Sequence, residues 1–169
     1  GQSVTFIFVD STQGWINTMD STSNERGNAF VAATGGTETI VCTNFKVHTF
    51  TGPGTFTVTN TGSPAGSNTV DYLVIAGGGS GGGGSGAGGG GAGGYRESPG
   101  TASGCYSVSP RGASPAVALP VSAQGYPITV GAGGASRVCS PIAGNSGADT
   151  VFSTITSAGG GGGGRGSSP

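Results

Sequence analysis

Hydrophobic and polar residues alternate along several short stretches of this chain, and no stretch shows the spacing of an amphipathic helix. The clearest alternation is Thr55-Phe56-Thr57-Val58-Thr59, which places the apolar side chains on one face of an extended strand. We expect Phe56 and Val58 to face a core and the three threonines to face water. The other stretches are rich in β-branched and aromatic residues, which favour strands. The pattern predicts an all-β fold of short antiparallel strands with essentially no α-helix.

Turn-forming residues between apolar stretches predict two hairpins. The first joins residues 4–9 to residues 15–16, and the second joins residues 44–50 to residues 55–59 through Thr-Gly-Pro-Gly. A short apolar segment at 30–33 lies between them and is closed by two glycines.

Glycines follow directly after three further predicted strands. These strands span residues 70–76, 126–130 and 151–156. The first leads into the glycine-rich run 77–94, and the last leads into the unbroken run 159–164. The end of the first strand is apolar without alternation, which is typical of a strand covered on both faces.

Two interpretations of the glycine runs stay open. By default, such segments are flexible linkers. Ordered glycine can instead adopt the polyproline II conformation, which has about three residues per turn and leaves its backbone groups to bond with neighbouring chains. Because a strand leads into glycines three times, we favour a bundle of short polyglycine II helices.

The chain divides into three regions on this basis. We expect residues 1–34 to end a preceding small β-module, residues 35–76 to form a hairpin and strand region, and residues 77–169 to form a polyglycine II domain with projecting loops. Because the chain starts at Gly1 rather than Met and ends just after a glycine run, we expect a fragment of a longer polypeptide.

Composition and charge exclude several classes of partner. Only 8% of the 169 residues are charged, and the formal net charge is −1. Nucleic acids and anionic membranes require clustered Lys and Arg, which are absent here, so we expect neither as a partner. No apolar run approaches the roughly 20 residues of a membrane-spanning helix, so we expect no membrane insertion.

The residues needed for catalysis or metal binding are scarce. His48 is the only histidine, and it falls in a predicted strand, where a structural role is favoured. The seven carboxylates show no spacing typical of acid–base chemistry. Gly77–Gly82 follows a strand but lacks the helix and the Lys-Ser/Thr pair of a phosphate-binding loop. We expect no enzyme, no metal and no cofactor.

The three cysteines, Cys42, Cys105 and Cys139, fit no metal-binding spacing. Cys105 and Cys139 could form a disulfide, but three unpaired thiols are the favoured interpretation because the sequence does not establish an oxidising compartment.

Two loops between glycine segments are the candidates for recognition, because binding residues concentrate on loops held by rigid scaffolds. These loops span residues 97–119 and 137–145. The candidate contact residues are Tyr95, Arg96, Glu97, Tyr106, Arg111 and Arg137. For Tyr95 to Glu97, a cap over the end of the bundle is the favoured alternative.

Five segments together resemble the glycine-rich domain of bacteriophage tail-fibre and adhesin proteins, especially those of marine phages. They span residues 46–58, 70–79, 90–97, 126–134 and 153–161. The first residues, with Asp10 to Trp15, look like the closing strands of a small β-module that often precedes this domain. The resemblance implies a virion component, usually homotrimeric, in which polyglycine II helices display variable loops.

The sequence and the resemblance together lead to a functional hypothesis. We expect a structural component of a phage tail fibre that contacts a bacterial surface receptor, protein or glycan, and that assembles with other tail proteins. It would reside in the virion and act outside the cell. The alternatives are a shaft or connector without receptor contact, and a secreted glycine-rich ice-binding or extracellular matrix protein.

Overall fold

Short strands alternate with turns along the chain in the computed structural model, which describes residues 6–12, 14–17, 30–43, 45–62, 66–100, 117–137 and 141–167. The strands are β1 (Phe6–Phe8), β2 (Trp15–Asn17), β3 (Ala32–Thr34), β4 (Thr37–Val41), β5 (Phe45–Thr49), β6 (Gly54–Asn60), β7 (Thr69–Val70), β8 (Leu73–Ile75), β9 (Tyr95–Glu97), β10 (Leu119–Pro120), β11 (Gly125–Thr129), β12 (Thr150–Phe152) and β13 (Ile155–Ser157). These described residues contain no helix, which confirms the predicted all-β class.

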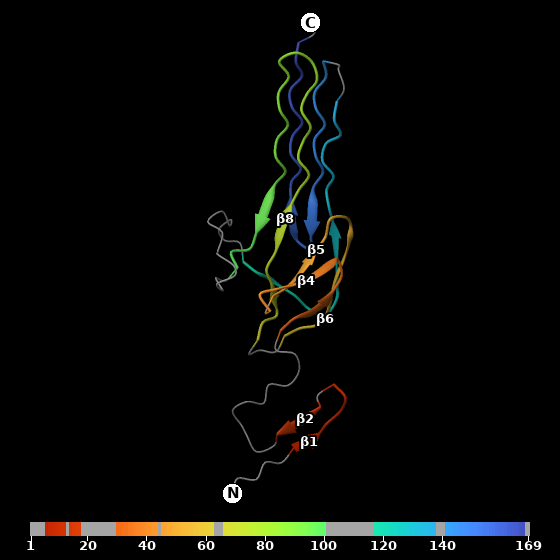
Figure 1. Ribbon diagram of the computed structural model, residues 1–169, viewed down its shortest axis with the longest axis vertical. Coiled ribbons are helices and arrows are strands. Elements are labelled where there is room, and N and C mark those ends of the chain that lie inside the picture. Colours follow the sequence, from red (N-terminus) through yellow and green to blue (C-terminus); the bar gives the residue numbers. More distant parts are fainter. Residues whose placement is uncertain are drawn as a thin grey trace.

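A five-stranded antiparallel sheet in the order β13-β12-β11-β6-β3 carries the core (Figure 1). Phe56 and Val58 of β6 are 7% and 2% exposed, as their alternation predicts. The Phe56 ring lies 5.9 Å from the Phe152 ring and 6.5 Å from the Tyr126 ring, measured between centroids. Aromatic packing of this kind stabilises beyond the apolar area that it buries.

Of the two predicted hairpins, the first is confirmed and the second is wrong. β1 pairs with β2, with Ile7 opposite Ile16. In contrast, β5 pairs with β4, a strand that we did not predict, while β6 pairs with β3 and β11. Burial of Phe56 and Val58 requires the distant strands β11 and β12, and this non-local packing prevails over the local turn.

Two other predicted strands differ from the structure. Residues 70–76 are not covered on both faces, because Leu73 and Ile75 are 57% and 53% exposed while Val74 between them is buried. Residues 151–156 form no single strand but end β12 and begin β13, with Ser153 at a φ of 54° in the turn between them. Neither glycine nor proline marks this turn, so the sequence pattern does not reveal it.

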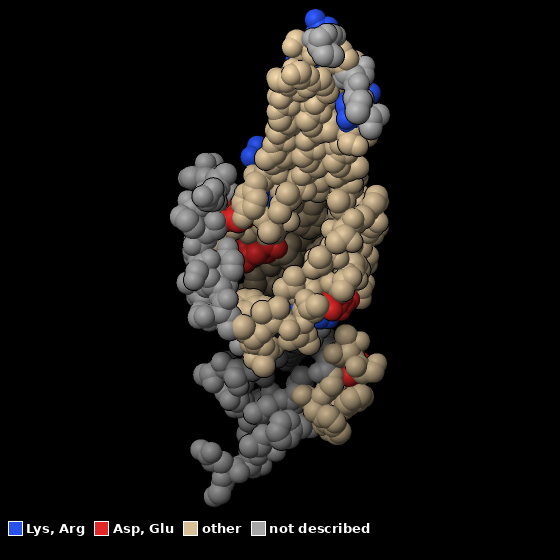
Figure 2. Space-filling model, turned by 45° about the horizontal axis from the view of Figure 1, so that its top comes forward, with Lys and Arg blue, Asp and Glu red and all other residues tan. Residues whose placement is uncertain are grey.

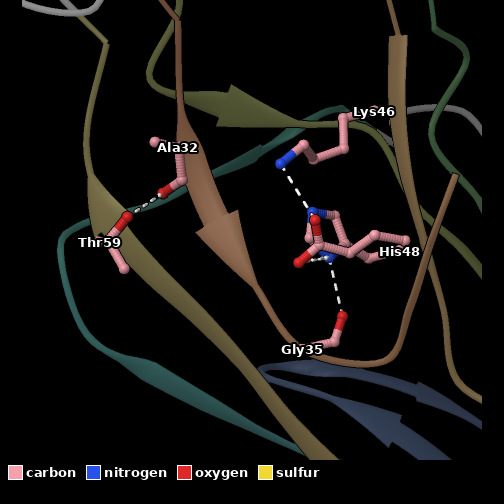
Figure 3. Close-up of polar contacts among 6 residues, drawn as sticks. Ala32, Gly35, Lys46, His48 and Thr59 are labelled. Atoms are coloured by element: carbon pink, nitrogen blue, oxygen red, sulfur yellow. Dashed lines mark hydrogen bonds and ion pairs between the residues drawn. The ribbon is translucent and has the colours of Figure 1, made fainter. Parts of the chain in front are cut away.

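Polar contacts attach the β4–β5 hairpin to the sheet (Figure 3). His48 Nδ1 lies 2.8 Å from the Gly35 carbonyl oxygen, and the ring packs edge-on against Phe56 at 5.1 Å. His48 therefore has the structural position in a strand that we favoured. Lys46 Nζ donates a 3.1 Å hydrogen bond to Glu38 Oε2, which holds the pKa of the Glu38 carboxyl below its ordinary value.

The turn after β4 places two side-chain-bearing residues in the left-handed region, with φ of 51° at Cys42 and 62° at Thr43. This conformation costs about 1–2 kcal/mol for an L-residue and is free of strain for glycine. Relief of this strain exceeds the backbone entropy that glycine loses on folding, so we expect Thr43→Gly to raise the free energy of unfolding by about 0.5–1 kcal/mol, measured by thermal unfolding. Thr39→Gly, in the extended part of β4, is the control and should destabilise; a loss of stability in Thr43→Gly as well would contradict the assignment of strain.

Candidate functional site

The glycine-rich segments run side by side as five extended legs beyond the sheet (Figure 1). We define them as leg 1 (residues 76–84), leg 2 (87–94), leg 3 (130–137), leg 4 (141–149) and leg 5 (158–167). Legs 1 and 5 follow β8 and β13, leg 3 follows β11, and legs 2 and 4 lead into β9 and β12. The β8–β9 pair thus anchors legs 1 and 2, and the five-stranded sheet anchors legs 3, 4 and 5. We call this anchored end the base, and the opposite end is the tip.

Hydrogen bonds of leg 1 repeat every three residues. The N–H groups of Ala76, Gly79 and Gly82 donate to carbonyls of leg 2 at 2.9, 2.8 and 3.0 Å. The N–H groups one position later, on Gly77, Ser80 and Gly83, donate to leg 4 at 3.1, 2.9 and 2.9 Å. This repeat equals the three residues per turn of the polyproline II conformation. The assignment of the legs as polyglycine II helices stays a prediction, supported by this repeat.

Leg 1 is the centre of the bundle. Besides legs 2 and 4, it bonds to leg 5 through the carbonyls of Gly77, Ser80 and Gly83, and to leg 3 through the Gly78 carbonyl. Leg 5 also accepts from legs 2 and 4, and leg 4 donates to leg 3. These pairings define two layers, with legs 2, 1 and 3 in one and legs 5 and 4 in the other.

Close packing of the legs requires glycine at specific positions. A Cβ built on Gly160 would lie 2.2 Å from the Gly91 carbonyl oxygen, and one on Gly147 would lie 2.1 Å from the Gly77 carbonyl oxygen. At these positions a Cα hydrogen points toward a carbonyl of the neighbouring leg, which adds a weak attraction. On the outer face, by contrast, a Cβ on Gly161 would meet nothing within 4 Å.

The tip is formed by the turn between legs 1 and 2 together with the ends of the other legs. Gly84 and Gly86 have φ of 99° and 71°, which only glycine adopts without strain. Ser167 N–H donates to the Ser85 carbonyl at 3.1 Å, so the end of leg 5 is fixed to this turn. Figure 2 shows Lys and Arg side chains around the tip and an uncharged flank below it on the face in view.

A comparison with protein families gives one match. The model of a glycine-rich domain matches residues 49–169, more than half of the chain. The chain belongs to this glycine-rich domain family. No curated protein and no solved structure matches it.

The glycine-rich domain separates the candidate contact residues that the sequence suggested. Tyr95, Arg96 and Glu97 form β9 at the base, paired with β8, whereas Arg137 ends leg 3 near the tip. Tyr106 and Arg111 lie outside the described residues. Glu97 is 7% exposed, and the Tyr95 hydroxyl donates to its carboxylate. The described candidates therefore do not form one site.

Sequence reasoning missed Arg165, an exposed residue of the tip, and did not single out Ile142, which lies within the candidate loop 137–145. A three-residue repeat along leg 5 would have indicated Arg165. Gly159 and Gly162 face leg 4, and Arg165 is the next residue in the same three-residue series. Ile142 is 39% exposed and follows Pro141, the first described residue of leg 4.

The cysteine interpretation needs a correction. Cys42 is disulfide-bonded, so three unpaired thiols are excluded. Its partner lies outside the described residues, as do Cys105 and Cys139. The sequence could not show this bond, because its spacing gives no information on which loops meet in space.

Metal-binding groups and membrane-spanning helices were also sought in the part of the chain that the structure describes. Within it, no group of three or more His, Cys, Asp or Glu residues could hold a metal ion. The same residues include no helix that could span a membrane.

Proposed function

We propose that this glycine-rich domain is a structural module of a phage tail fibre that contacts a bacterial surface receptor through the tip of its bundle. The observation that carries the proposal is the three-residue hydrogen-bond repeat, which joins leg 1 to legs 2, 4 and 5, while single bonds with legs 1 and 4 add leg 3 to the bundle. A bundle cross-linked along its whole length holds its tip in a fixed position, and preorganised contact surfaces lose less entropy on binding.

The location of side chains along the bundle supports the tip as the contact surface. Most positions of the legs carry glycine, alanine or serine, which offer few specific contacts. The longer side chains of Arg137, Ile142 and Arg165 are exposed near the tip. Arginine is among the residues that contribute most to binding interfaces.

The Cys42 disulfide supports an extracellular place of action. Disulfides persist in oxidising surroundings, which include secreted proteins and the surfaces of virions and cells. We therefore propose that the domain acts outside the cell as part of a virion, together with other tail proteins.

Copies of the chain are the proposed partners in the fibre, as a homotrimer. The β8–β9 pair exposes Leu73, Ile75 and Tyr95 at 57%, 53% and 43%, an apolar group of the kind that marks protein–protein contacts. Light scattering of the purified chain and of the Leu73→Ser/Ile75→Ser variant measures the mass. A trimer that dissociates in the variant supports this partner, and a monomeric parent chain contradicts it.

Binding to bacterial cells tests the proposed function. The labelled full chain is incubated with a panel of bacterial strains, and bound fluorescence is compared with that of an Arg137→Ser/Ile142→Ser/Arg165→Ser variant. We expect saturable binding to some strains and its loss in the variant. A Thr39→Ser/Thr59→Ser variant is the control, because both threonines are exposed on strands far from the tip. Absence of binding to every strain, or equal binding by the tip variant, would contradict the proposal.

A second candidate function is a shaft or matrix element without receptor contact, and one observation favours it. On the outer face of legs 2, 1 and 3, a Cβ on Gly78, Gly81 or Gly133 would meet its nearest atom at 3.5 Å or more, and one on Gly89 would meet nothing within 4 Å. Glycine has no steric need at these positions within the chain, and a face without side chains suits lateral packing against another copy. Absence of binding to every strain, in a chain that still assembles with copies of itself, would favour this function.

A further inference from the structure

We propose that the tip of the bundle binds an anionic group carried by a surface polysaccharide, held between Arg137 and Arg165 on either side of leg 4. This inference rests on the proposed contact function of the tip and specifies the chemistry of its ligand.

Charge is segregated along the bundle. The charged residues of the five legs are Arg137, Arg165 and Asp149. Asp149 lies at the base, where its Oδ1 accepts a 2.7 Å hydrogen bond from Gly159 N–H and β12 begins at the next residue. The described residues of the tip thus carry two positive charges and no carboxylate, in agreement with the distribution in Figure 2.

The hydrogen-bond register places Arg165 beside the start of leg 4. Built Cβ atoms on Gly159 and Gly162 lie 2.1 Å from the carbonyl oxygens of Gly147 and Gly144 in leg 4. Each step of three residues up leg 5 therefore corresponds to three residues back along leg 4. The next step brings Arg165 to the level of Pro141, so its side chain leaves leg 5 on the side of leg 4.

Arg137 flanks leg 4 from the opposite side, at the end of leg 3. Its Nη2 donates a hydrogen bond to Asn145 Oδ1, and Asn145 Nδ2 donates a 2.7 Å bond to the Ala135 carbonyl. The amide of Asn145 is neutral, so it orients the guanidinium without cancelling its charge. Further N–H donors of the guanidinium fork stay available to a ligand.

The combination of groups favours a charged sugar over a free inorganic ion. A guanidinium forms paired, charge-assisted hydrogen bonds with a carboxylate or a phosphate. Ile142, 39% exposed on leg 4 next to Pro141, adds an apolar surface that the C–H face of a sugar ring can cover. An acidic polysaccharide offers many such groups in a row, so that several tips of one fibre bind at once and gain avidity.

Binding of the full chain to immobilised polymers tests the inference. The probes are polygalacturonate for carboxylate, phosphorylated dextran for phosphate and unmodified dextran as the neutral reference. We expect binding to at least one anionic polymer, little to neutral dextran, and a decline with added salt. Arg137→Gln and Arg165→Gln should each weaken binding about tenfold, and the double variant should lose it.

Lys46→Gln is the charge-matched control, because Lys46 lies on β5 and pairs with Glu38 away from the tip. An equal loss of binding in Lys46→Gln and the tip variants would indicate nonspecific charge attraction and overturn the inference. So would the absence of binding to both anionic polymers. Cell binding separates this outcome from failure of the proposed function: a parent chain that binds cells while its double arginine variant binds equally well leaves the surface-contact function standing and refutes the anionic ligand.

Discussion

Gly160→Ala is expected to disrupt the bundle, whereas Gly161→Ala in the next position is expected to leave it intact. The new Cβ at position 160 would lie 2.2 Å from the Gly91 carbonyl oxygen and 2.7 Å from that of Ala92. Both atoms belong to the backbone and cannot turn away as a flexible side chain would, so legs 2 and 5 must separate. Gly160 also donates to the Gly77 carbonyl at 2.8 Å, a bond that the separation weakens.

The expected loss in Gly160→Ala is about 3 kcal/mol or more. In a chain of this size it corresponds to a fall of about 10 °C in the midpoint of thermal unfolding. At Gly161 a Cβ meets nothing within 4 Å, and alanine there should be neutral or stabilise by up to about 1 kcal/mol. Calorimetry of the parent chain and the two variants measures the midpoint of thermal unfolding and tests both predictions. Equal midpoints for all three would show that the close approach of legs 2 and 5 does not exist in solution.

Phe56→Ala is expected to have an effect of similar or greater size on the sheet. Phe56 is 7% exposed and packs against the rings of His48, Tyr126 and Phe152. Removal of the ring leaves a cavity that β6, paired on both sides, cannot close. We expect a loss of about 3–5 kcal/mol in the free energy of unfolding, measured by urea titration followed by circular dichroism.

Phe45→Ala is the matched control for this prediction. Phe45 is an aromatic residue of β5, the strand that precedes β6 in the chain, but it is 43% exposed. Its replacement should cost about 1 kcal/mol. Comparable losses in both variants would mean that the aromatic cluster around Phe56 is not the core of the sheet.

The sequence predicts local features of the fold well because they depend on neighbouring residues. The alternation at residues 55–59 identifies the buried face of β6, and the turn residues after Phe8 identify the β1–β2 hairpin. The pairing of β6 with β11 could not be predicted, because it depends on packing of Phe56 against Tyr126 and Phe152, far along the chain. The exposure of Leu73 and Ile75 was missed for a related reason, since among the described strands β8 pairs with β9 alone, in a two-stranded sheet.

The candidate site was predicted only in part. Recurrent glycine segments indicate legs, but which legs are neighbours depends on the register of their hydrogen bonds, and a sequence rich in one residue does not fix a register. Tyr95 and Arg137 both border glycine runs, yet β9 ends leg 2 at the base and Arg137 ends leg 3 near the tip. The direction of each leg follows from whether its strand comes before or after it. This direction would have assigned Tyr95 to the base and Arg137 to the tip.

Amide hydrogen exchange of leg 1, measured by NMR at single-residue resolution, tests the ordered glycine bundle most directly. Gly77, Gly79, Ser80, Gly82 and Gly83 donate to neighbouring legs at 2.8–3.1 Å, whereas within the described residues Gly78 and Gly81 donate to none. We expect slow exchange at the first five amides and fast exchange at Gly78 and Gly81, repeating every three residues. Uniformly fast exchange along residues 77–83, as in a flexible linker, would contradict the account.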